Sequence, residues 1–297
     1  MPIARPDRRP ALRERVEATA ALVERRGYAL SPERLGQLCL GGPVAAAEVL
    51  AVVADGHRLA LREGLVVTHR QAEAAPAIAA RARSHALHAP PWLAVTRRFV
   101  RLLVRLNPYV LGVAIAGSLA SGGFAAPDDV DLNLIVEDGH RHLAYVALNL
   151  LGMAHALRHR SKPVDVHSRR PLAPRLMTAN LILERSQCFP LARQDPAMAF
   201  ELLVSRPIHG LETWRELLAA NPRLREHFPQ LDWPDEAIVV RPWLPAWAFP
   251  RGLDRAARLV GEAGWRWMQW TRRRRPEARA RVAYVRETMR PYALFDR

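Results

Sequence analysis

The chain has 297 residues, of which 49% are hydrophobic and 25% charged, a balance typical of a folded globular protein rather than a disordered one. A chain of this length can bury a core without disulfides, and its only two cysteines, Cys39 and Cys188, exclude a disulfide scaffold and a zinc ribbon. The net charge of +15 comes almost entirely from arginine, and such a surface attracts nucleic acid, nucleotides or anionic lipid.

The sequence predicts no targeting segment and no membrane span. Arg5, Arg8 and Arg9 are followed by a charged stretch and not by an apolar signal core. The longest uncharged run, residues 106–127, contains Pro108 and several glycines, so we expect strand, turn and loop there rather than a membrane helix. Because the few cysteines also fit a reducing compartment, we expect a soluble, cytoplasmic protein.

The N-terminal quarter predicts three helices followed by a hairpin. Residues 11–26 place apolar side chains on one helical face, and Ser31 and Pro32 provide the N-cap and first position of a second helix. A third helix is expected over 43–56, and two short β-like runs follow within 57–69. This outline is that of a winged-helix module, which binds DNA or protein, although a plain packing domain of helices and a hairpin gives the same pattern.

The middle of the chain alternates strands with helices. Residues 76–91 are rich in Ala, Arg and Pro and end at Pro90 and Pro91, which is typical of a helical linker. We expect helices at 92–106 and 139–158 and strands at 109–116, 130–136 and 163–167. This alternation indicates an α/β (α+β) core with a small mixed sheet. After Pro171 the sequence predicts a mainly helical region, with helices at 194–205, 211–220, 253–270 and 276–290.

The strongest chemical signal lies at the start of the second strand of this core. Alternate side chains of a strand share a face, so Asp129 and Asp131 point the same way while Val130 points into the core. At ~4 Å and an effective dielectric of about 20, two carboxylates repel by on the order of 4 kcal/mol, and a bound divalent cation removes that penalty. Because hard oxygen ligands suit Mg²⁺, the pair predicts a metal site.

Two further features extend this prediction. A strand that ends in Gly117 and Ser118 at a tight turn presents backbone N–H groups and a hydroxyl to phosphate oxygens. A third carboxylate, Asp165, lies within an apolar run, where a buried ion pair with Arg169 or Lys162 is the alternative to a catalytic role. If its strand lies beside the pair, three carboxylates converge, enough for two Mg²⁺ ions about 3.5–4 Å apart.

These residues resemble the DNA-polymerase-beta-like nucleotidyltransferase superfamily, whose mark is a strand-terminal Gly-Ser followed about ten residues later by Asp-apolar-Asp. Ten residues separate Ser118 from Asp129. The resemblance implies that Gly117 and Ser118 contact the nucleotide phosphates. It also implies that Asp129 and Asp131 bind the metals and that Asp165, as a third metal-binding acid, helps to activate the acceptor hydroxyl.

The chain as a whole looks like stand-alone bacterial nucleotidyltransferases with a winged-helix-like region in front. The implied organisation is a winged-helix-like module at 1–75, a linker at 76–91, a nucleotidyltransferase core at 92–210 and a helical, arginine-rich region at 211–297. Two residues depart from the superfamily pattern: Asp128 stands where a small hydroxyl residue is usual, and Asn133 stands where an apolar residue is usual.

The resemblance implies transfer of a nucleoside monophosphate from an NTP such as ATP to a hydroxyl acceptor, with release of pyrophosphate. The implied cofactor is Mg²⁺ in a two-metal site, with Mn²⁺ as a substitute. The basic surface favours RNA or protein as the acceptor. The alternative is a catalytically inactive protein of this fold that acts as a nucleic-acid-binding or regulatory module.

The arginine excess is concentrated at the C-terminal end, where residues 251–297 hold 13 arginines and 5 acidic residues. Within it, residues 253–275 combine three tryptophans with four consecutive arginines. This segment predicts a helix that packs its aromatic residues on the core, a nucleic-acid-facing helix, or a helix on an anionic membrane surface.

Other polar and aromatic residues have structural or functional interpretations. His140 and His142 lie at a helix start and are a polar first turn or a binding site for metal or phosphate. Trp233, Trp243 and Trp247 lie among prolines and predict a segment that wraps over the core.

Overall fold

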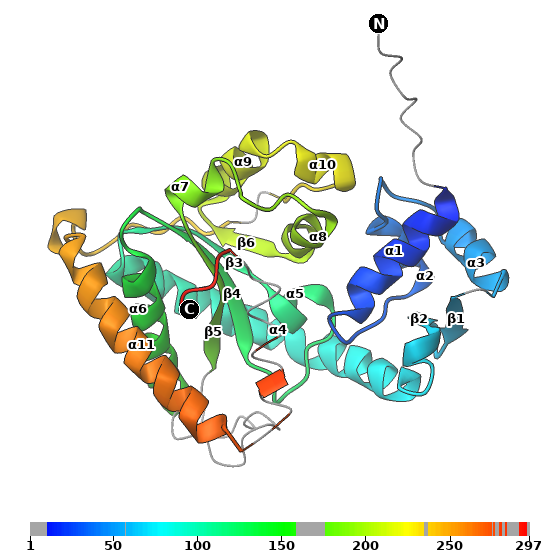
Figure 1. Ribbon diagram of the computed structural model, residues 1–297, viewed down its shortest axis with the longest axis horizontal. Coiled ribbons are helices and arrows are strands. Elements are labelled where there is room, and N and C mark those ends of the chain that lie inside the picture. Colours follow the sequence, from blue (N-terminus) through cyan, green and yellow to red (C-terminus); the bar gives the residue numbers. More distant parts are fainter. Residues whose placement is uncertain are drawn as a thin grey trace, which may run out of the picture. The chain divides into compact units, whose positions relative to one another are not determined.

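A computed structural model of the chain describes residues 11–56, 58–158, 176–234 and 237–274, together with positions 276, 279–280, 283 and 291–295. The described part contains eleven α-helices and two small sheets, which confirms the predicted mixed α/β architecture (Figure 1). None of these described helices combines the length and the apolarity needed to cross a bilayer.

The chain forms two compact units, and neither is continuous in sequence. Unit 1 holds the described residues of Met1–Ser84, Arg193–Val204 and Asn221–Asp232. Unit 2 holds those of His85–Ala192, Ser205–Ala220 and Trp233–Arg297. The segments expected from the sequence, at 1–75, 76–91, 92–210 and 211–297, are each continuous, so their boundaries do not coincide with those of the units.

Unit 1 begins with three helices and a hairpin, in the order expected. The elements are α1 (Leu12–Glu24), α2 (Pro32–Gln37), α3 (Ala46–Ala54), β1 (Leu59–Arg62), β2 (Leu65–Thr68) and the short 3₁₀ helix η1 (His69–Gln71). Glu63 and Gly64 join the strands at φ of 52° and 73°, the backbone that a two-residue hairpin prefers. An isolated bridge from Leu30 to Val66 adds a third segment to the hairpin.

Two later helices complete unit 1, namely α8 (Pro196–Val204) and α10 (Arg223–His227). The Gly41 N–H donates to the His227 carbonyl at 2.7 Å, and the rings of Phe200 and Phe228 lie 5.7 Å apart. The first contact attaches the α10 segment to the N-terminal part of unit 1, and the second joins the two later segments to each other. An ion pair between Arg26 and Glu201 at 2.7 Å attaches α8 to the N-terminal part. The predicted helix at 194–205 is thus confirmed, but it belongs to unit 1 rather than to the α/β core.

A single long helix, α4 (Ala75–Leu106), runs through Pro90 and Pro91. The prediction of a linker that ends at these prolines, before a separate helix, is therefore wrong. Each proline removes a backbone hydrogen bond and usually ends or kinks a helix. Here burial opposes that tendency, because Ala89 just before the prolines and Phe99 after them are both buried in the core of unit 2.

The sheet of unit 2 has four strands in the order β5-β4-β3-β6. The strands are β3 (Val110–Ile115), β4 (Val130–Val136), β5 (Met177–Glu184) and β6 (Arg206–His209). Strand β4 is parallel to β5 and antiparallel to β3, and β3 is antiparallel to β6. The strands predicted at 109–116 and 130–136 are confirmed, whereas the strand predicted at 163–167 lies outside the described residues.

The mainly helical region predicted after Pro171 also contains two strands, β5 and β6, which lie outside its predicted helices and were not expected. The residues of β5 include a Leu-Ile-Leu run that is buried in the sheet, and a short apolar run does not distinguish a buried strand from a buried helix. The predicted helices at 211–220 and 253–270 are present as α9 (Leu211–Ala220) and α11 (Gly252–Arg272). Most of the predicted helix at 276–290 lies outside the described residues.

The two faces of β4 differ in chemistry. Its apolar face packs into a core to which α4 and α6 (Arg141–Arg158) contribute, and the β4 residues in that core are Val130, Leu132, Leu134 and Val136. The opposite face carries Asp131 and Asn133. On the neighbouring strand, Trp214 of α9 lies so close to Gly112 that a Cβ there would be 2.8 Å from its Nε1. Trp214 and the fully buried Asn133 and Ile135 thus cover much of this second face as well, and Asp131 on it is half-buried.

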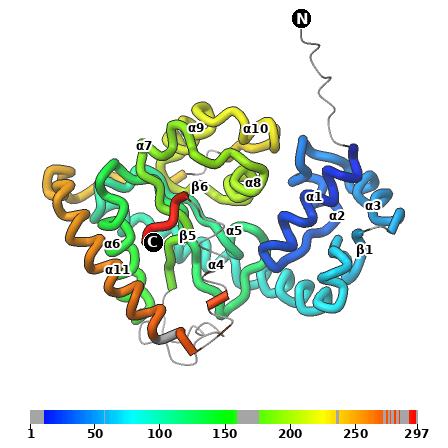
Figure 2. The backbone as a smooth tube through the Cα atoms, in the orientation of Figure 1, coloured from blue at the N-terminus to red at the C-terminus, as the bar shows by residue number. Residues whose placement is uncertain are grey.

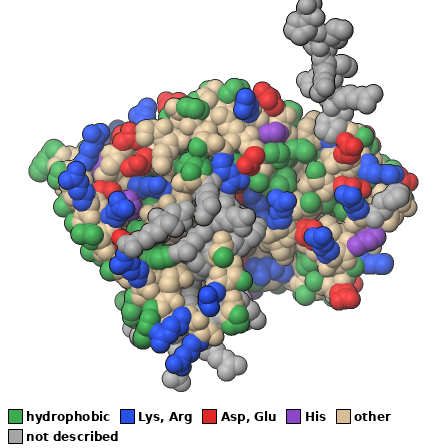
Figure 3. Space-filling view, viewed as in Figure 1, with side chains coloured by type: hydrophobic (Ala, Val, Ile, Leu, Met, Phe, Trp, Pro, Cys, Tyr) green, Lys and Arg blue, Asp and Glu red, His purple; other side chains and the backbone are tan. Residues whose placement is uncertain are grey.

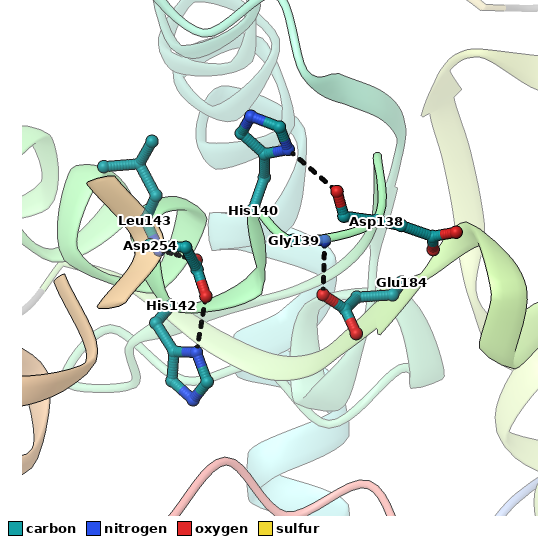
Figure 4. Close-up of polar contacts among 7 residues, drawn as sticks. All are labelled: Asp138, Gly139, His140, His142, Leu143, Glu184 and Asp254. Atoms are coloured by element: carbon teal, nitrogen blue, oxygen red, sulfur yellow. Dashed lines mark hydrogen bonds and ion pairs between the residues drawn. The ribbon is translucent and has the colours of Figure 1, made fainter. Parts of the chain in front are cut away.

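The helices α6 and α11 lie side by side, as the tube in Figure 2 shows. Asp254 of α11 fixes this arrangement, because one carboxylate oxygen accepts the Leu143 N–H at 2.8 Å and the other is 2.9 Å from His142 Nδ1 (Figure 4). The first N–H groups of a helix lack intrahelical partners and favour a negative charge nearby. Asp254 thus caps α6 from a helix more than a hundred residues away.

The two histidines at the start of α6 both have partners within the protein. His140 Nε2 lies 2.7 Å from the Phe249 carbonyl oxygen, and its ring stacks on Tyr109 with a centroid distance of 5.0 Å. His142 pairs with Asp254 as described above. These contacts support the interpretation of a polar first turn.

The segment before α11 only partly covers the core. Trp233 is buried and packs edge-on against Trp214, with centroids 6.0 Å apart. Trp243 and Trp247 are exposed, so the prediction that all three tryptophans wrap over the core is wrong for these two. The Arg105 guanidinium stacks over the Trp243 ring at 4.9 Å, which holds that indole on the surface.

The Asp254 cap predicts a pH-dependent stability. Burial opposes ionisation of this carboxyl, but hydrogen bonds from His142 and from the Leu143 N–H outweigh it and hold the pKa of Asp254 below its usual value. Because the pKa of Asp254 is lower in the folded than in the unfolded protein, its ionisation stabilises the fold at pH values above the unfolded-state pKa of about 3.9. This stabilisation is lost as the pH falls through the folded-state pKa. We expect Asp254→Asn to lower the free energy of unfolding at pH 7 by about 1.5–3 kcal/mol.

Denaturant unfolding of both proteins from pH 7 to pH 3 checks this. The difference between them should shrink on acidification, because a protonated Asp254 resembles asparagine. The matched substitution Asp232→Asn, at an exposed side chain, should cost less than about 0.5 kcal/mol. A difference that stays constant down to pH 3 would rule out the charged cap.

Candidate functional site

The turn after β3 is built around Gly117. The Ala116 N–H donates to the Asp131 carbonyl at 2.9 Å, and the five-residue helix α5 (Gly117–Ser121) then begins. Gly117 has a φ of +60°, and a Cβ placed on it would lie 2.2 Å from Asp131 Oδ2. Only glycine fits, because a carboxylate oxygen of Asp131 packs directly against the backbone of the turn.

Asp128 organises the loop that follows this turn. Its Oδ2 accepts hydrogen bonds from the Ser118 hydroxyl at 2.9 Å and from the Ala125 N–H at 3.0 Å. The loop is also held to α4, because the Phe124 N–H donates to His85 Nδ1 at 3.2 Å. Burial lowers the pKa of His85, and the nearby charge of Arg206 adds to the effect, which favours the neutral ring that this acceptor role requires.

Asp129 and Asp131 converge on one hydroxyl group. Thr178 Oγ1, on the adjacent strand β5, lies 2.8 Å from Asp131 Oδ1 and 3.4 Å from Asp129 Oδ2. The two carboxylate oxygens therefore lie no farther apart than the sum of these two distances. All three side chains are half-buried, so solvent can reach the group. The predicted pairing of the two aspartates is thus present in the geometry of β4 and β5.

A buried amide network continues the same face of the sheet. The Asn133 Nδ2 group donates to the Ser205 hydroxyl at 3.1 Å, and its Oδ1 accepts from Asn180 Nδ2 at 2.8 Å. Asn133 is fully buried, and polar groups in such a position are costly unless they are hydrogen-bonded. This network joins β4 to β5 and to the residue before β6, and it supplies the hydrogen-bond partners of the buried Asn133 amide.

The donor set fits a divalent cation in part. Two carboxylates and a hydroxyl within a few ångströms supply the hard oxygen atoms that Mg²⁺ or Mn²⁺ prefers, and Asp129 and Asp131 would hold the ion. The third predicted ligand, Asp165, lies outside the described residues. Among the residues that are described, no group of three or more His, Cys, Asp or Glu side chains could hold a metal ion.

Sequence reasoning missed the contributions of β5. Thr178 and Asn180 were assigned to a helical region, although they alternate with Met177, Ala179 and Leu181 as strand residues do. This alternation predicts a strand. If that strand is placed beside β4, Thr178 and Asn180 lie on the same face of the sheet as Asp131. Strand β5 therefore presents a threonine, and not an acid, next to the aspartate pair.

Comparison with known proteins adds no family assignment. No protein-family model matches the chain, and no curated protein or solved structure matches it significantly. The resemblance to nucleotidyltransferases accordingly depends on Gly117, Ser118, Asp129 and Asp131 and on their arrangement.

The close approach of Asp131 to Gly117 can be tested with two alanine substitutions. Gly122 ends α5 with a φ of +102°, and a Cβ on it would meet nothing within 4 Å. Both Gly117→Ala and Gly122→Ala should pay the strain of a positive φ, about 1–2 kcal/mol. Gly117→Ala should cost about 1–3 kcal/mol more in the free energy of unfolding, because it displaces the Asp131 carboxylate. Equal losses in denaturant unfolding would contradict this packing.

Proposed function

We propose that this chain is a Mg²⁺-dependent nucleotidyltransferase, which transfers a nucleoside monophosphate from an NTP to a hydroxyl acceptor and releases pyrophosphate. The observation that carries the proposal is the position of the Asp131 carboxylate, which lies against the Gly117 turn and shares the Thr178 hydroxyl with Asp129. A phosphate-binding turn and a carboxylate pair are the two parts that such a reaction requires side by side.

Each residue has a distinct role in this proposal. Asp129 and Asp131 hold divalent cations, which when bound neutralise the triphosphate and favour ionisation of the attacking hydroxyl. The first-turn N–H groups after Gly117 and the Ser118 hydroxyl position the phosphates. Thr178 is a positioning residue, because its hydroxyl orients both carboxylates. Asp165 is the proposed group that assists the acceptor.

The winged-helix-like interpretation of unit 1 favours a protein contact over DNA reading. In winged and related helix-turn-helix modules a helix reads base edges with Arg, Lys, Asn or Gln side chains. Helix α3 has the sequence AAEVLAVVA, and its exposed positions carry Glu48, Leu50 and alanines. A face of this kind offers no basic or amide side chain to phosphates or to base edges. We propose that unit 1 contributes protein contacts to the enzyme.

Nucleotide binding tests the enzyme proposal. Wild-type protein should bind NTPs with a dependence on Mg²⁺, and Asp129→Asn with Asp131→Asn should weaken that binding by about 100-fold or more, since two charge-assisted contacts are lost. The matched control is Asp55→Asn with Asp232→Asn, which removes the same charge from exposed side chains and should bind normally. Equal titration curves for the two double variants would refute the proposal.

The acceptor can be identified from the product. Incubation of the protein with each labelled NTP, Mg²⁺ or Mn²⁺, and cell extract should place label on RNA or protein, in line with the basic surface. Label on a small molecule would contradict the expected acceptor class, and label independent of Asp129 and Asp131 would contradict the site.

A second candidate function has one observation in its favour. Strand β5 places Thr178 beside the aspartates where a third acid would complete the site, which suits an inactive nucleotidyltransferase fold that binds nucleic acid or regulates a partner. This function predicts salt-dependent nucleic-acid binding that survives the Asp129→Asn and Asp131→Asn pair, with no affinity for NTPs.

A further inference from the structure

Helix α11 presents three different faces along its length. One face packs on unit 2 through Asp254, Ala257 and Gly261, and a Cβ on Gly261 would lie 2.9 Å from the Phe295 ring and 3.3 Å from Tyr145. Because Gly261 has no side chain, the helix approaches α6 closely. This side of α11 is occupied, whereas the other two sides carry exposed side chains among the residues that the structure describes.

The second face is apolar and exposed. Its large side chains and their exposed fractions are Leu253 (42%), Leu259 (70%), Val260 (63%), Trp267 (50%) and Trp270 (59%). At 100° per residue these five positions fall within an arc of about 120°, turned away from the packed face. The interpretation that the helix packs its tryptophans on the core is therefore wrong for Trp267 and Trp270. Trp265 contacts Phe295, with centroids 6.2 Å apart.

The third face is basic. Arg255, Arg258, Arg266 and Arg273 are exposed and lie along one side of α11, between the packed and the apolar faces. Arg266 pairs with Glu262 at 2.7 Å, and Arg273 stacks over the Trp270 ring at 4.3 Å. In Figure 3 hydrophobic and basic side chains lie together along the edge of the molecule that α11 occupies in Figure 1. A row of cations next to an apolar stripe marks a helix suited to an anionic, partly apolar partner.

We propose that α11 binds the surface of an anionic lipid bilayer, with its apolar face in the interface and its arginines on the headgroup phosphates. An amphipathic helix with tryptophans on the apolar side and arginines beside them binds in this way. A helix of 21 residues is about 31 Å long, but it lies in the plane of the surface and does not span the membrane. This inference is independent of the proposed enzymatic function.

Charge and chemistry disfavour the other occupants. In a second copy of this chain the same face would bring the arginines beside Leu259 against those of its partner, and like charges repel. Single-stranded RNA would stack on the tryptophan rings, but it would not bury the aliphatic part of the apolar face, which consists of Leu253, Leu259 and Val260. A bilayer interface uses both the aliphatic and the basic side chains.

Flotation of the full-length protein with vesicles tests the proposal. The protein should float with phosphatidylcholine vesicles that contain about one third phosphatidylserine, and little with phosphatidylcholine alone. Replacement of Trp267 and Trp270 by glutamine should lower the partition coefficient by about tenfold or more, since two exposed indoles no longer insert. The matched control Leu87→Gln removes a side chain that is 74% exposed on α4, and it should float like the wild type.

Charge variants separate the headgroup contribution from insertion. Arg255→Gln with Arg258→Gln should weaken binding to the anionic vesicles by about 25-fold, at roughly fivefold for each arginine near the surface. Arg62→Gln with Arg70→Gln removes the same net charge from exposed positions of unit 1 and should have little effect. Far-ultraviolet circular dichroism checks that every variant is folded.

Three outcomes would overturn the proposal. In the first, the wild-type protein stays at the bottom of the gradient with anionic vesicles. In the second, the tryptophan and arginine variants float as the wild type does. In the third, the wild type does not float but forms a dimer in solution, which the tryptophan variants convert to a monomer. Binding to single-stranded RNA through these side chains, without flotation, would also assign the face to another partner.

Discussion

The convergence of two carboxylates on one hydroxyl group, from Asp129 just before β4 and Asp131 within it, is the interaction on which the candidate site of unit 2 depends. Asp129 and Asp131 both lie within reach of the Thr178 hydroxyl, and Asp131 also packs against the backbone of Gly117. A single hydroxyl hydrogen can be donated to only one of the two carboxylates at a time. The two half-buried acids supply the oxygen atoms of the divalent-cation site that we propose.

The surroundings of the pair resist rearrangement. On one side, the Ala116 N–H and the Gly117 backbone hold Asp131, and on the other the Asn133 amide is bonded to both Asn180 and Ser205. Buried polar networks of this kind are stable only when every member is satisfied, so they tolerate few alternative arrangements. The rigidity of the sheet, and not of the loop, therefore positions the acidic residues.

The elements that the sequence predicted well are those with a strong local pattern. The strands around Val113 and Leu132 follow from their apolar residues, and their contact with the Gly117 turn follows from the spacing of glycine and acids. Strand β5 was not predicted: its first residues alternate between apolar and polar, but the Leu-Ile-Leu run that follows does not distinguish a strand from a helix, and its partner β4 lies more than 40 residues earlier. Helix α4 continues through Pro90 and Pro91 because tertiary burial overrides a local signal to stop. The Asp254 cap joins residues more than a hundred positions apart, so no local sequence pattern predicts it.

The most direct test of the cation site compares thermal unfolding of the wild type and Asp131→Asn with and without Mg²⁺. Mg²⁺ should raise the unfolding temperature of the wild type relative to EDTA, because an ion that binds only the folded protein stabilises it. Asp131→Asn should show little or no such rise, since the substitution removes a carboxylate ligand. A wild-type unfolding temperature that does not respond to Mg²⁺, or an equal rise in both proteins, would contradict a site organised around a cation.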